Sequence, residues 1–345
     1  MRILLIGGTG TISSAITALL SSRVSSGLRN DEIWVLNRGK KNPDLPEGVM
    51  QIIADAYDKK SLSEAVDGLK FDVVCYFIGF DVNQVIVAHD VFAGKIKQFV
   101  YISSASAYQK PPASYLITEE TPLENPFWEY SRKKIECENY LMEKYNSEGF
   151  PVTIIRPSHT YCERSVPIGV HGDKGSWQAL KRMIIGKPVI VHGDGTSLWT
   201  MTDSRDFAVA FTGLLGKPEA IGQAFHITSD ESITWNQIYT DISDALSEVL
   251  GRTVKPVLHH VTSDRIIKEG FAYGYDNVGN LLGDKANSVV FDNSKVKALV
   301  PEFDARADRV GITEIETDEM RHEIVQRLLI YIVLEVEVHG RSPHG

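Results

Sequence analysis

The fold is decided by the stretch Arg2-Ile3-Leu4-Leu5-Ile6-Gly7-Gly8-Thr9-Gly10-Thr11-Ile12-Ser13. Its first part, Arg2–Ile6, has the apolar composition of a buried strand, and a glycine-rich turn that opens a helix follows directly. Glycine lets the backbone turn tightly and approach a pyrophosphate, whose charge is stabilised at the helix N-terminus. Ser13 replaces the third glycine of the usual pattern and is small enough for close packing of the helix on the strand.

A glycine motif alone is weak evidence for a cofactor site. Here the strand, the motif and the helix occur in the required order, which favours a dinucleotide-binding turn over an ordinary glycine-rich turn. The residues expected to contact the cofactor at this turn are Gly7, Thr9, Gly10, Thr11 and Ile12.

Short β-rich runs alternate with helical patterns through residues 1–157. The expected strands are Arg2–Ile6, Glu32–Leu36, Gln51–Ala54, Asp72–Phe77, Gln98–Ile102 and Val152–Ile155, and the expected helices are Ser13–Ser22, Ser61–Ala65, Val82–Phe92 and Glu129–Tyr145. Strands that are apolar almost throughout are typical of a parallel sheet covered on both faces. We therefore predict an α/β fold with a Rossmann-type, doubly wound parallel sheet and an NAD(P)-binding domain over residues 1–157.

The alternation stops after residue 157, where turn-rich segments interrupt the chain and a clear helical pattern spans Trp235–Leu250. We expect residues 158–345 to form mainly a smaller α/β lobe that binds the substrate, with some segments that return to the Rossmann domain. Ligands of doubly wound sheets bind outside the carboxyl ends of the strands, so the cleft between the two parts is the expected site.

The end of the second expected strand bears on the choice of cofactor. An acidic residue there would accept a hydrogen bond from the ribose of NAD and repel the phosphate of NADP. Asn37 removes that repulsion, and Arg38 with Lys40 could pair with the phosphate, which favours NADP over NAD. The alternative is a solvated basic loop. Asp55, at the end of the third strand, is expected near the adenine, or else is a surface cap.

Candidate reacting groups follow the fifth strand and open the fourth helix. Ser103, Ser104 and Ser106 supply hydroxyls, and Tyr130 and Lys134 lie four residues apart, on one helical face. A phenol can move a carbinol proton near neutral pH only if a neighbouring cation lowers its pKa. Lys134 could do this and also bond the nicotinamide ribose, while a serine holds the substrate oxygen. Taken alone, a Tyr–Lys pair more often marks an amphipathic surface.

Together these motifs resemble the extended short-chain dehydrogenase/reductases of the NAD-dependent epimerase/dehydratase group, from residue 1 to about residue 300. The resemblance implies catalytic roles for Ser104, Tyr130 and Lys134 and a nicotinamide-facing segment at Ile155-Arg156-Pro157-Ser158-His159-Thr160-Tyr161. It extends the expected cofactor contacts to Asn37, Arg38, Asp55, Ala56, Phe77, Ile78, Ser103, Tyr130, Lys134, Pro157 and His159, and it gives Ser104, Ser106, His159 and Trp199 as substrate-binding residues.

Two departures limit the resemblance. The 4,6-dehydratases carry an acidic pair where this chain has Ala105-Ser106, which disfavours dehydration. Nucleotide-sugar epimerases commonly hold the diphosphate with an arginine after a GDG-type turn, where this chain has Trp199; Arg182 and Arg205 are the candidate replacements. Residues 186–208 also resemble the atypical branch that contains the chloroplast stem-loop-binding proteins, which are RNA-associated.

Composition restricts the remaining function classes. The chain has 345 residues with 36 basic and 45 acidic side chains, and a net charge of −9 argues against nucleic-acid binding. Three separated cysteines without a CxxC pair argue against a disulfide framework or a zinc site, so no metal is expected. The apolar run Leu328–Leu334 is far shorter than the roughly 20 residues that span a bilayer, and the N-terminus lacks a signal-peptide pattern, so a cytoplasmic protein without a membrane partner is expected.

Two functions follow as hypotheses. The first is an NAD(P)-dependent epimerase or oxidoreductase that transfers a hydride at a secondary alcohol or ketone of a carbohydrate-like small molecule. The second is a non-catalytic, cofactor-binding or RNA-associated protein of the same fold. The resemblance also implies a homodimer through the helices Val82–Phe92 and Glu129–Tyr145, the alternative being a monomer.

Overall fold

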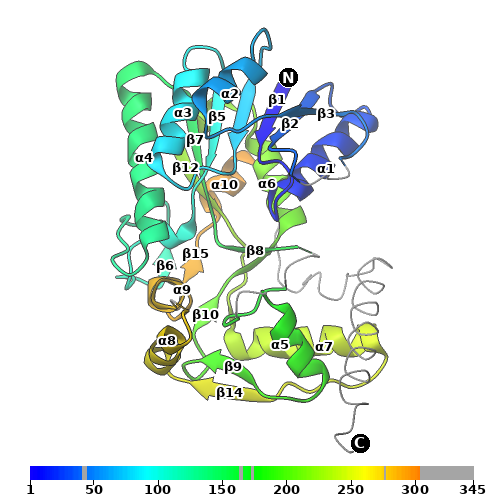
Figure 1. Cartoon of the computed structure of the whole chain (residues 1–345), viewed down its shortest axis with the longest axis vertical. Coiled ribbons are helices and arrows are strands. Elements are labelled where there is room, and N and C mark those ends of the chain that lie inside the picture. The colour runs from blue at the N-terminus through cyan, green and yellow to red at the C-terminus, as the bar shows by residue number, and fades with distance from the viewer. Residues whose placement is uncertain (41–44, 163–165, 172–174, 276, 304–345) are drawn as a thin grey trace, which may run out of the picture.

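A seven-stranded parallel sheet forms the larger part of the computed structural model, which describes residues 1–40, 45–162, 166–171, 175–275 and 277–303 (Figure 1). From one edge to the other its strands are β12 (Gln223–Ile227), β7 (Val152–Pro157), β5 (Gln98–Ile102), β4 (Val73–Tyr76), β1 (Arg2–Ile6), β2 (Glu32–Asn37) and β3 (Val49–Ile53). This order confirms the predicted doubly wound sheet. The seventh strand, β12, was not expected; its polar residues Gln223 and His226 interrupt the apolar run that marks the other strands.

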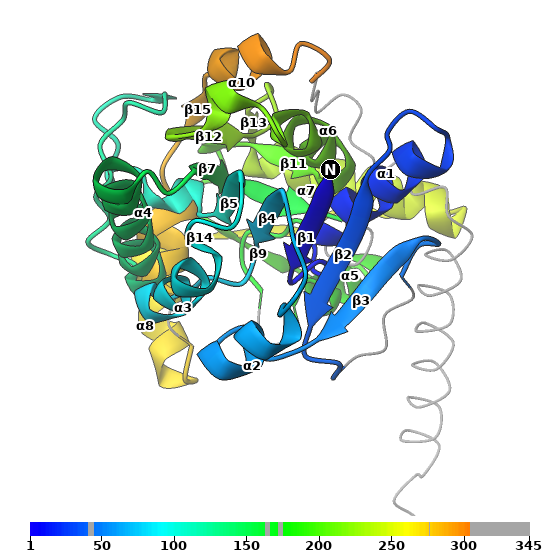
Figure 2. The same ribbon diagram turned by 90° about the horizontal axis from the view of Figure 1, so that it is seen from above.

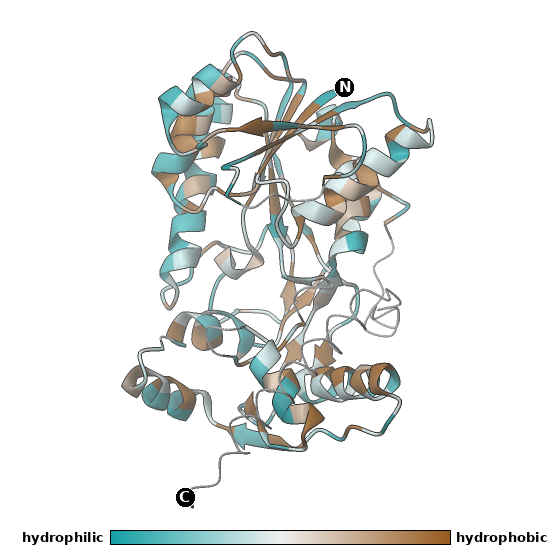
Figure 3. Cartoon of the chain, turned by 45° about the vertical axis from the view of Figure 1, so that its right-hand side comes forward, coloured by the Kyte–Doolittle hydropathy of each residue, from teal (hydrophilic) through white to brown (hydrophobic). Residues whose placement is uncertain are grey.

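Helices cover both faces of this sheet (Figure 2). One face is covered by α1 (Ser13–Ser25), α6 (Ser204–Leu214) and α10 (Ser294–Leu299), and the other by α2 (Lys59–Ala65), α3 (Val82–Phe92) and α4 (Glu129–Glu148). Alternate residues of β1 enter the two resulting cores: Ile3 and Leu5 pack towards α1, Leu4 and Ile6 towards α3. The strands are apolar along their length for this reason, as their colour in Figure 3 shows.

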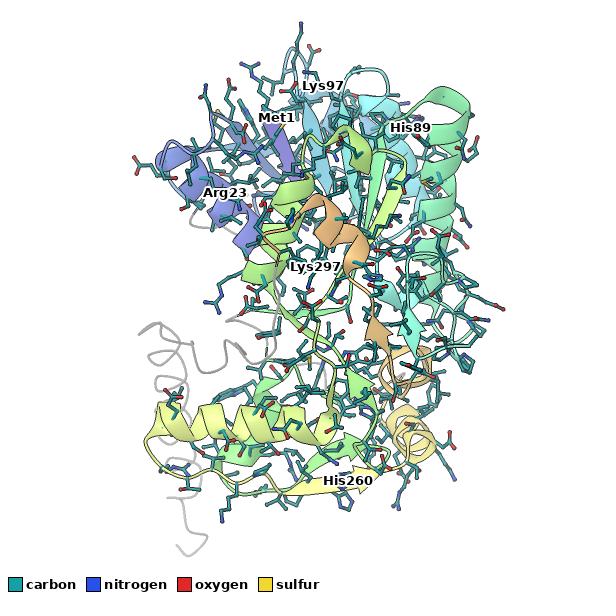
Figure 4. All side chains as sticks on the ribbon, turned by 180° about the vertical axis from the view of Figure 1, so that it is seen from behind. Met1, Arg23, His89, Lys97, His260 and Lys297 are labelled. Atoms are coloured by element: carbon teal, nitrogen blue, oxygen red, sulfur yellow. The ribbon has the colours of Figure 1, made fainter. Side chains whose placement is uncertain are left out.

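The smaller lobe lies beyond the carboxyl ends of the strands. Met1 and Lys97, which precede β1 and β5, lie at the end of the sheet farthest from this lobe, whereas His260 lies at the lobe's outer edge (Figure 4). The lobe contains the helices α5 (Trp177–Ile184), α7 (Trp235–Leu250), α8 (Ser263–Ala272) and α9 (Val278–Asn280) and the short strands β9 (Val189–His192), β10 (Leu198–Trp199), β13 (Ile233–Thr234) and β14 (Leu258–Val261).

Two short strand pairings connect the two parts. The strand β8 (His159–Tyr161) continues from β7 and pairs with β11 (Met201–Asp203), which leads into α6. The strand β6 (Leu116–Ile117) pairs with β15 (Val290–Phe291), just before α10. As a result, the segment around residue 285 lies against the turn that follows β5, although the two are far apart in the sequence.

Local caps explain where the predicted helices begin and end. The hydroxyl of Thr234 accepts a hydrogen bond from the backbone of Gln237 at the start of α7, and Gly251, with φ 61°, ends it. The carboxylate of Asp81 accepts from the backbone of Asn83 at the start of α3. Within the described residues, no helix is long and apolar enough to cross a membrane. Residues 304–345, including the apolar run Leu328–Leu334 and the end of the expected second lobe, lie outside the described residues.

Candidate functional site

The glycine turn between β1 and α1 is closed by Ser13. Its hydroxyl donates to the carbonyl oxygen of Gly7 at 2.6 Å and accepts from the backbone nitrogen of Gly10 at 2.8 Å. Ser13 is buried, so the residue that replaces the third glycine both permits close packing and fixes the shape of the turn. Gly7 has φ 86°, and a Cβ atom there would lie 2.6 Å from Ile78 Cγ2. Both the backbone conformation and the space therefore require glycine at this position.

The helix start that follows this turn can hold a phosphate group. No side chain caps α1 at Ile12, so the backbone N–H groups of its first turn are not satisfied by a capping residue. Thr11 and Gly10 are exposed beside it. An open helix N-terminus next to a glycine turn suits the pyrophosphate of a dinucleotide.

The end of β2 carries the groups expected near the adenosine ribose. Asn37 Oδ1 accepts from the backbone nitrogen of Gly39 at 3.0 Å and from Gln51 Nε2 at 3.3 Å. Its amide nitrogen Nδ2 is buried and has no hydrogen-bond partner among the described residues. Arg38 is exposed directly beside it. The position therefore offers an unused donor and a cation, rather than the acceptor that an acidic residue would supply.

The ends of β3 and β4 border the same region. Asp55 is exposed and accepts from the backbone nitrogen of Tyr57, whose hydroxyl donates to the carbonyl oxygen of Ile78 at 2.8 Å. Ala56 is buried, and Phe77 and Ile78 are partly buried beyond the end of β4. Phe77 and Ile78 lie beside Gly7, and Tyr57 links the turn after β3 to Ile78, so these residues lie along the carboxyl ends of the strands, where a dinucleotide binds in this fold.

A cavity of about 290 Å³ lies between the sheet and the smaller lobe. It brings together most of the residues expected at the reacting end of the site: Ser104, Ser106, Tyr130, Pro157, His159 and Trp199 all line it. Lys134 and Ser103 do not; both are buried behind the cavity wall.

A chain of hydroxyl groups leads to Tyr130. Ser131 Oγ donates to Ser106 Oγ at 2.7 Å, and Ser106 Oγ lies 2.9 Å from Ser104 Oγ. Burial raises the pKa of Tyr130 to about 12, a hydrogen bond with the Ser104 side chain opposes this, and the charge of Asp284 adds to it. Ser104 therefore favours the ionised form of the phenol.

Lys134 is held differently from the sequence-based expectation. Its Nζ donates to the carbonyl oxygens of Gly79 and Ile102, each at 2.7 Å, and lies 5.7 Å from the centre of the Tyr130 ring. Burial lowers the pKa of Lys134 to about 8, although Cys137 and Glu138 act in the opposite direction. Its ammonium therefore joins α4 to the ends of β4 and β5, below the phenol.

His159 and Trp199 form part of the opposite wall. Burial, with Lys285 and His171 nearby, lowers the pKa of His159 to about 3, so its imidazole is neutral at neutral pH and can exchange hydrogen bonds but not charge. Trp199 stacks on Trp235, with ring centres 5.9 Å apart, and is 2% exposed. It belongs to the core of the smaller lobe and also borders the cavity.

The two candidate arginines for a diphosphate lie elsewhere. Arg205, at the start of α6, forms a bidentate pair with Asp203 at 2.9 and 3.0 Å. Arg182 lines a separate groove of about 590 Å³ between α5, α8, β9 and β14. Neither lines the cavity that contains Tyr130.

Several residues of the cavity were not predicted from the sequence. The polar ones are Lys110, Trp128, Asn280, Asp284 and Lys285, whereas Ser158 and Thr160 belong to the segment expected to face the nicotinamide. Asp284 and Lys285 belong to a π-helical turn, Leu281–Lys285, a local geometry frequent at functional sites. The sequence signal for these two residues was a pair of adjacent charges next to a glycine. The sequence does not show that the pairing of β6 with β15 brings this pair close to Ser104. Within the described residues no cluster of three or more His, Cys, Asp or Glu could hold a metal ion.

Comparison with known proteins identifies relatives of this chain. The model of the NAD-dependent epimerase/dehydratase family matches residues 3–228. The chain is 23% identical to 2'-dehydrokanamycin reductase of Streptomyces kanamyceticus, over 91% of this chain and 83% of that protein. It is 24% identical to the chloroplast stem-loop binding protein of 41 kDa b of Arabidopsis thaliana, over 68% of this chain and 60% of that protein.

Solved structures show the same fold. UDP-glucose 4-epimerase from Thermotoga maritima, solved with UDP-glucose, superposes with a TM-score of 0.70 at 18% identity and covers 95% of this chain and 100% of that one. At this level of identity the likeness establishes the architecture, while the site must be argued from its own residues.

Proposed function

Because the chain belongs to the NAD-dependent epimerase/dehydratase family, we propose that it is an NAD(P)-dependent sugar epimerase or reductase. Its substrate is a secondary alcohol or ketone of a sugar or sugar-nucleotide-like molecule. The observation that carries this proposal is that Ser104 and Tyr130 line one cavity together with Pro157, at the carboxyl end of β7. The same edge of the sheet holds the glycine turn.

The residues of the cavity have separable tasks. Tyr130 takes the proton of the substrate hydroxyl in oxidation and returns it in reduction, and Ser104 orients the substrate oxygen and favours the phenolate. When bound, the nicotinamide supplies a hydride acceptor or donor. Lys134 helps to position Tyr130 through its bonds to Gly79 and Ile102, and it is the residue that would bond the nicotinamide ribose of a bound cofactor.

The end of β2 supports NADP as the preferred cofactor. The unused Nδ2 donor of Asn37 and the exposed guanidinium of Arg38 both suit the oxygens of a 2′-phosphate. An acidic side chain, which would repel this phosphate, is absent from residues 37–40.

The same hydroxyl chemistry serves an epimerase and a reductase. Retention of the cofactor through the reaction would make the protein an epimerase, and release of the cofactor would make it a reductase or dehydrogenase. Similarity to 2'-dehydrokanamycin reductase over most of the chain supports a reductase that releases its cofactor.

The proposal is tested with purified protein in two steps. The protein is first denatured to identify any nicotinamide cofactor it carries, and stripped protein is then titrated with NAD, NADP and NADPH. We expect the Tyr130→Phe variant to bind the cofactor as the wild type does and to lose hydride transfer to a panel of ketones and sugars. Unchanged turnover in Tyr130→Phe, or absence of nicotinamide binding, would contradict the proposed function.

A further inference from the structure

Three charged groups stand together in the cavity near Tyr130. Lys110 follows the serine turn after β5, and Asp284 and Lys285 come from the π-helical turn Leu281–Lys285. Lys110 is 4% exposed and Lys285 is 6% exposed. Charged side chains are rarely buried to this degree unless a partner compensates them.

The two walls of this cluster are held in place by backbone contacts. Asn125 Nδ2 donates to the carbonyl oxygens of Ser106 and Gly283, each at 2.7 Å, and so joins the serine turn to the π-helical turn. The carbonyl oxygen of Lys285 lies 3.0 Å from His192 Nε2 and accepts from Trp235 Nε1 at 3.2 Å. The backbone nitrogen of Lys110 donates to the carbonyl oxygen of Glu124 at 2.8 Å, so the backbone of both lysines is held by the fold.

The two lysines differ in their hydrogen-bond partners. Lys285 Nζ donates to Asn280 Oδ1 at 2.7 Å. The ammonium of Lys110 has no hydrogen bond or ion pair within the part of the chain that the structure describes; Asp284 acts on it only through space. His159 is neutral, so two cations face one carboxylate and the cavity has a positive balance. Burial lowers the pKa of both lysines, while the charge of Asp284 acts in the opposite direction.

We propose that the substrate carries an anionic substituent, a carboxylate or a phosphate, which binds Lys110 while the reacting hydroxyl or ketone faces Tyr130. This inference rests on the proposed function, because it concerns the substrate of the same cavity. Lys110, Asp284 and Tyr130 line the same cavity, so the cluster adjoins the reacting phenol. Ligand pockets commonly measure roughly 300–1,000 Å³, and a cavity of about 290 Å³ suits an acid of monosaccharide size.

The test compares acidic and neutral probes of the same shape. Affinities of D-glucuronate, D-galacturonate, D-glucose 6-phosphate, D-glucose and D-galactose are measured by calorimetry on protein saturated with its cofactor. The variants are Lys110→Met, Lys110→Arg as a charge-preserving rescue, and Lys255→Met as a control at an exposed lysine of the smaller lobe.

We expect the acidic probes to bind the wild type about ten- to a hundredfold more tightly than the neutral ones. Lys110→Met should remove this preference, Lys110→Arg should restore most of it, and Lys255→Met should leave it unchanged. Tighter binding of the uronates than of the sugar phosphate identifies a carboxylate as the substituent, and the reverse identifies a phosphate.

The inference is overturned if the wild type binds none of the acidic probes, shows no charge preference, or keeps its preference in Lys110→Met. Tyr130-dependent hydride transfer without charge preference would refute this inference alone. Lys110-dependent binding of acids by a protein that binds no nicotinamide would instead refute the proposed function.

Discussion

Lys134 donates a hydrogen bond of 2.7 Å to the carbonyl oxygen of Gly79, which lies just beyond β4. The same ammonium bonds the carbonyl oxygen of Ile102 at the end of β5, so one side chain of α4 joins two strand ends next to the site. Tyr130 is one helical turn earlier on α4. The position of Tyr130 relative to the sheet therefore depends on this contact as well as on the packing of α4.

Replacing Lys134 with Met should destabilise the fold. The substitution removes the ammonium donor from the buried carbonyl oxygen of Ile102, while that of Gly79 keeps its hydrogen bond from the Tyr101 hydroxyl. A buried unsatisfied group costs about 1–3 kcal/mol. Urea unfolding of the cofactor-free protein measures the effect. The matched control is Lys133→Met, because Lys133 is 41% exposed and its ion pair with Glu129 is on the surface. Equal free energies of unfolding for the two variants would show that the contacts of Lys134 contribute no net stability.

Removing the hydroxyl of Ser104 should shift the pH dependence of substrate oxidation upwards. Its hydrogen bond lowers the pKa of Tyr130, so in Ser104→Ala the phenolate forms at higher pH. A hydrogen bond contributes about 1 kcal/mol, which corresponds to a shift of about one pH unit. The profile of kcat/KM against pH is the measurement, and Ser104→Thr, which keeps a hydroxyl, should restore it. If kcat/KM falls in Ser104→Ala but its pH profile does not shift, Ser104 holds the substrate and does not affect the pKa of Tyr130.

The sheet and the cofactor turn were predictable because their signals are local. The apolar run Arg2–Ile6, the glycines after it and the helix start lie within one short stretch, and β1 has the predicted bounds. The helices α3 and α7 also have their predicted bounds, since a cap or a glycine marks their ends. Periodicity and turn residues thus determine these elements without tertiary information.

The second wall of the cavity was not predictable for the opposite reason. Asp284 and Lys285 meet Lys110 only because β6 pairs with β15 and because Asn125 joins two segments across the fold. No periodic pattern encodes such a contact. The strand β12 was missed similarly: its polar residues are accommodated by partners from other elements, such as Tyr108 and Asp292 around His226.

The buried pair of Glu138 and Arg156 should be essential for stability. Arg156 donates to both carboxylate oxygens, with a shortest distance of 2.7 Å, and also to the hydroxyl of Tyr108. Removing one partner of a buried ion pair leaves an uncompensated charge and costs about 3–5 kcal/mol. We therefore expect a large fall in the free energy of unfolding for Glu138→Ala. The exposed Glu136→Ala on the same helix should stay close to the wild type. A similar small effect for both would mean that Arg156 finds another partner.

Acid should destabilise the protein partly through His159. Its pKa is about 3 in the folded protein against 6.5 as the reference value, so between these values the unfolded chain binds a proton that the folded one does not. The free energy of unfolding therefore falls as the pH is lowered, by at most about 1.4 kcal/mol per pH unit for this residue. His159→Gln removes this contribution while His192 and the carboxylates remain. The difference in unfolding free energy between wild type and variant should change from pH 7 to pH 4; a constant difference would show that His159 titrates normally.

The choice of cofactor should depend on residue 37. In Asn37→Asp a carboxylate replaces the unused amide donor, so it accepts from a ribose hydroxyl and repels a 2′-phosphate. We expect the affinity for NADPH to fall about ten- to a hundredfold and that for NADH to stay equal or rise, because a lost charge-assisted hydrogen bond is replaced by repulsion. Fluorescence titration with both cofactors measures this. Arg38→Ala should weaken the binding of NADPH but not that of NADH. Arg29→Ala is the control, because Arg29 is distant from the turn and paired with Asp31, and it should change neither affinity. If both β2 variants bind NADPH as the wild type does, the 2′-phosphate is not recognised at this strand end and NAD becomes the preferred cofactor.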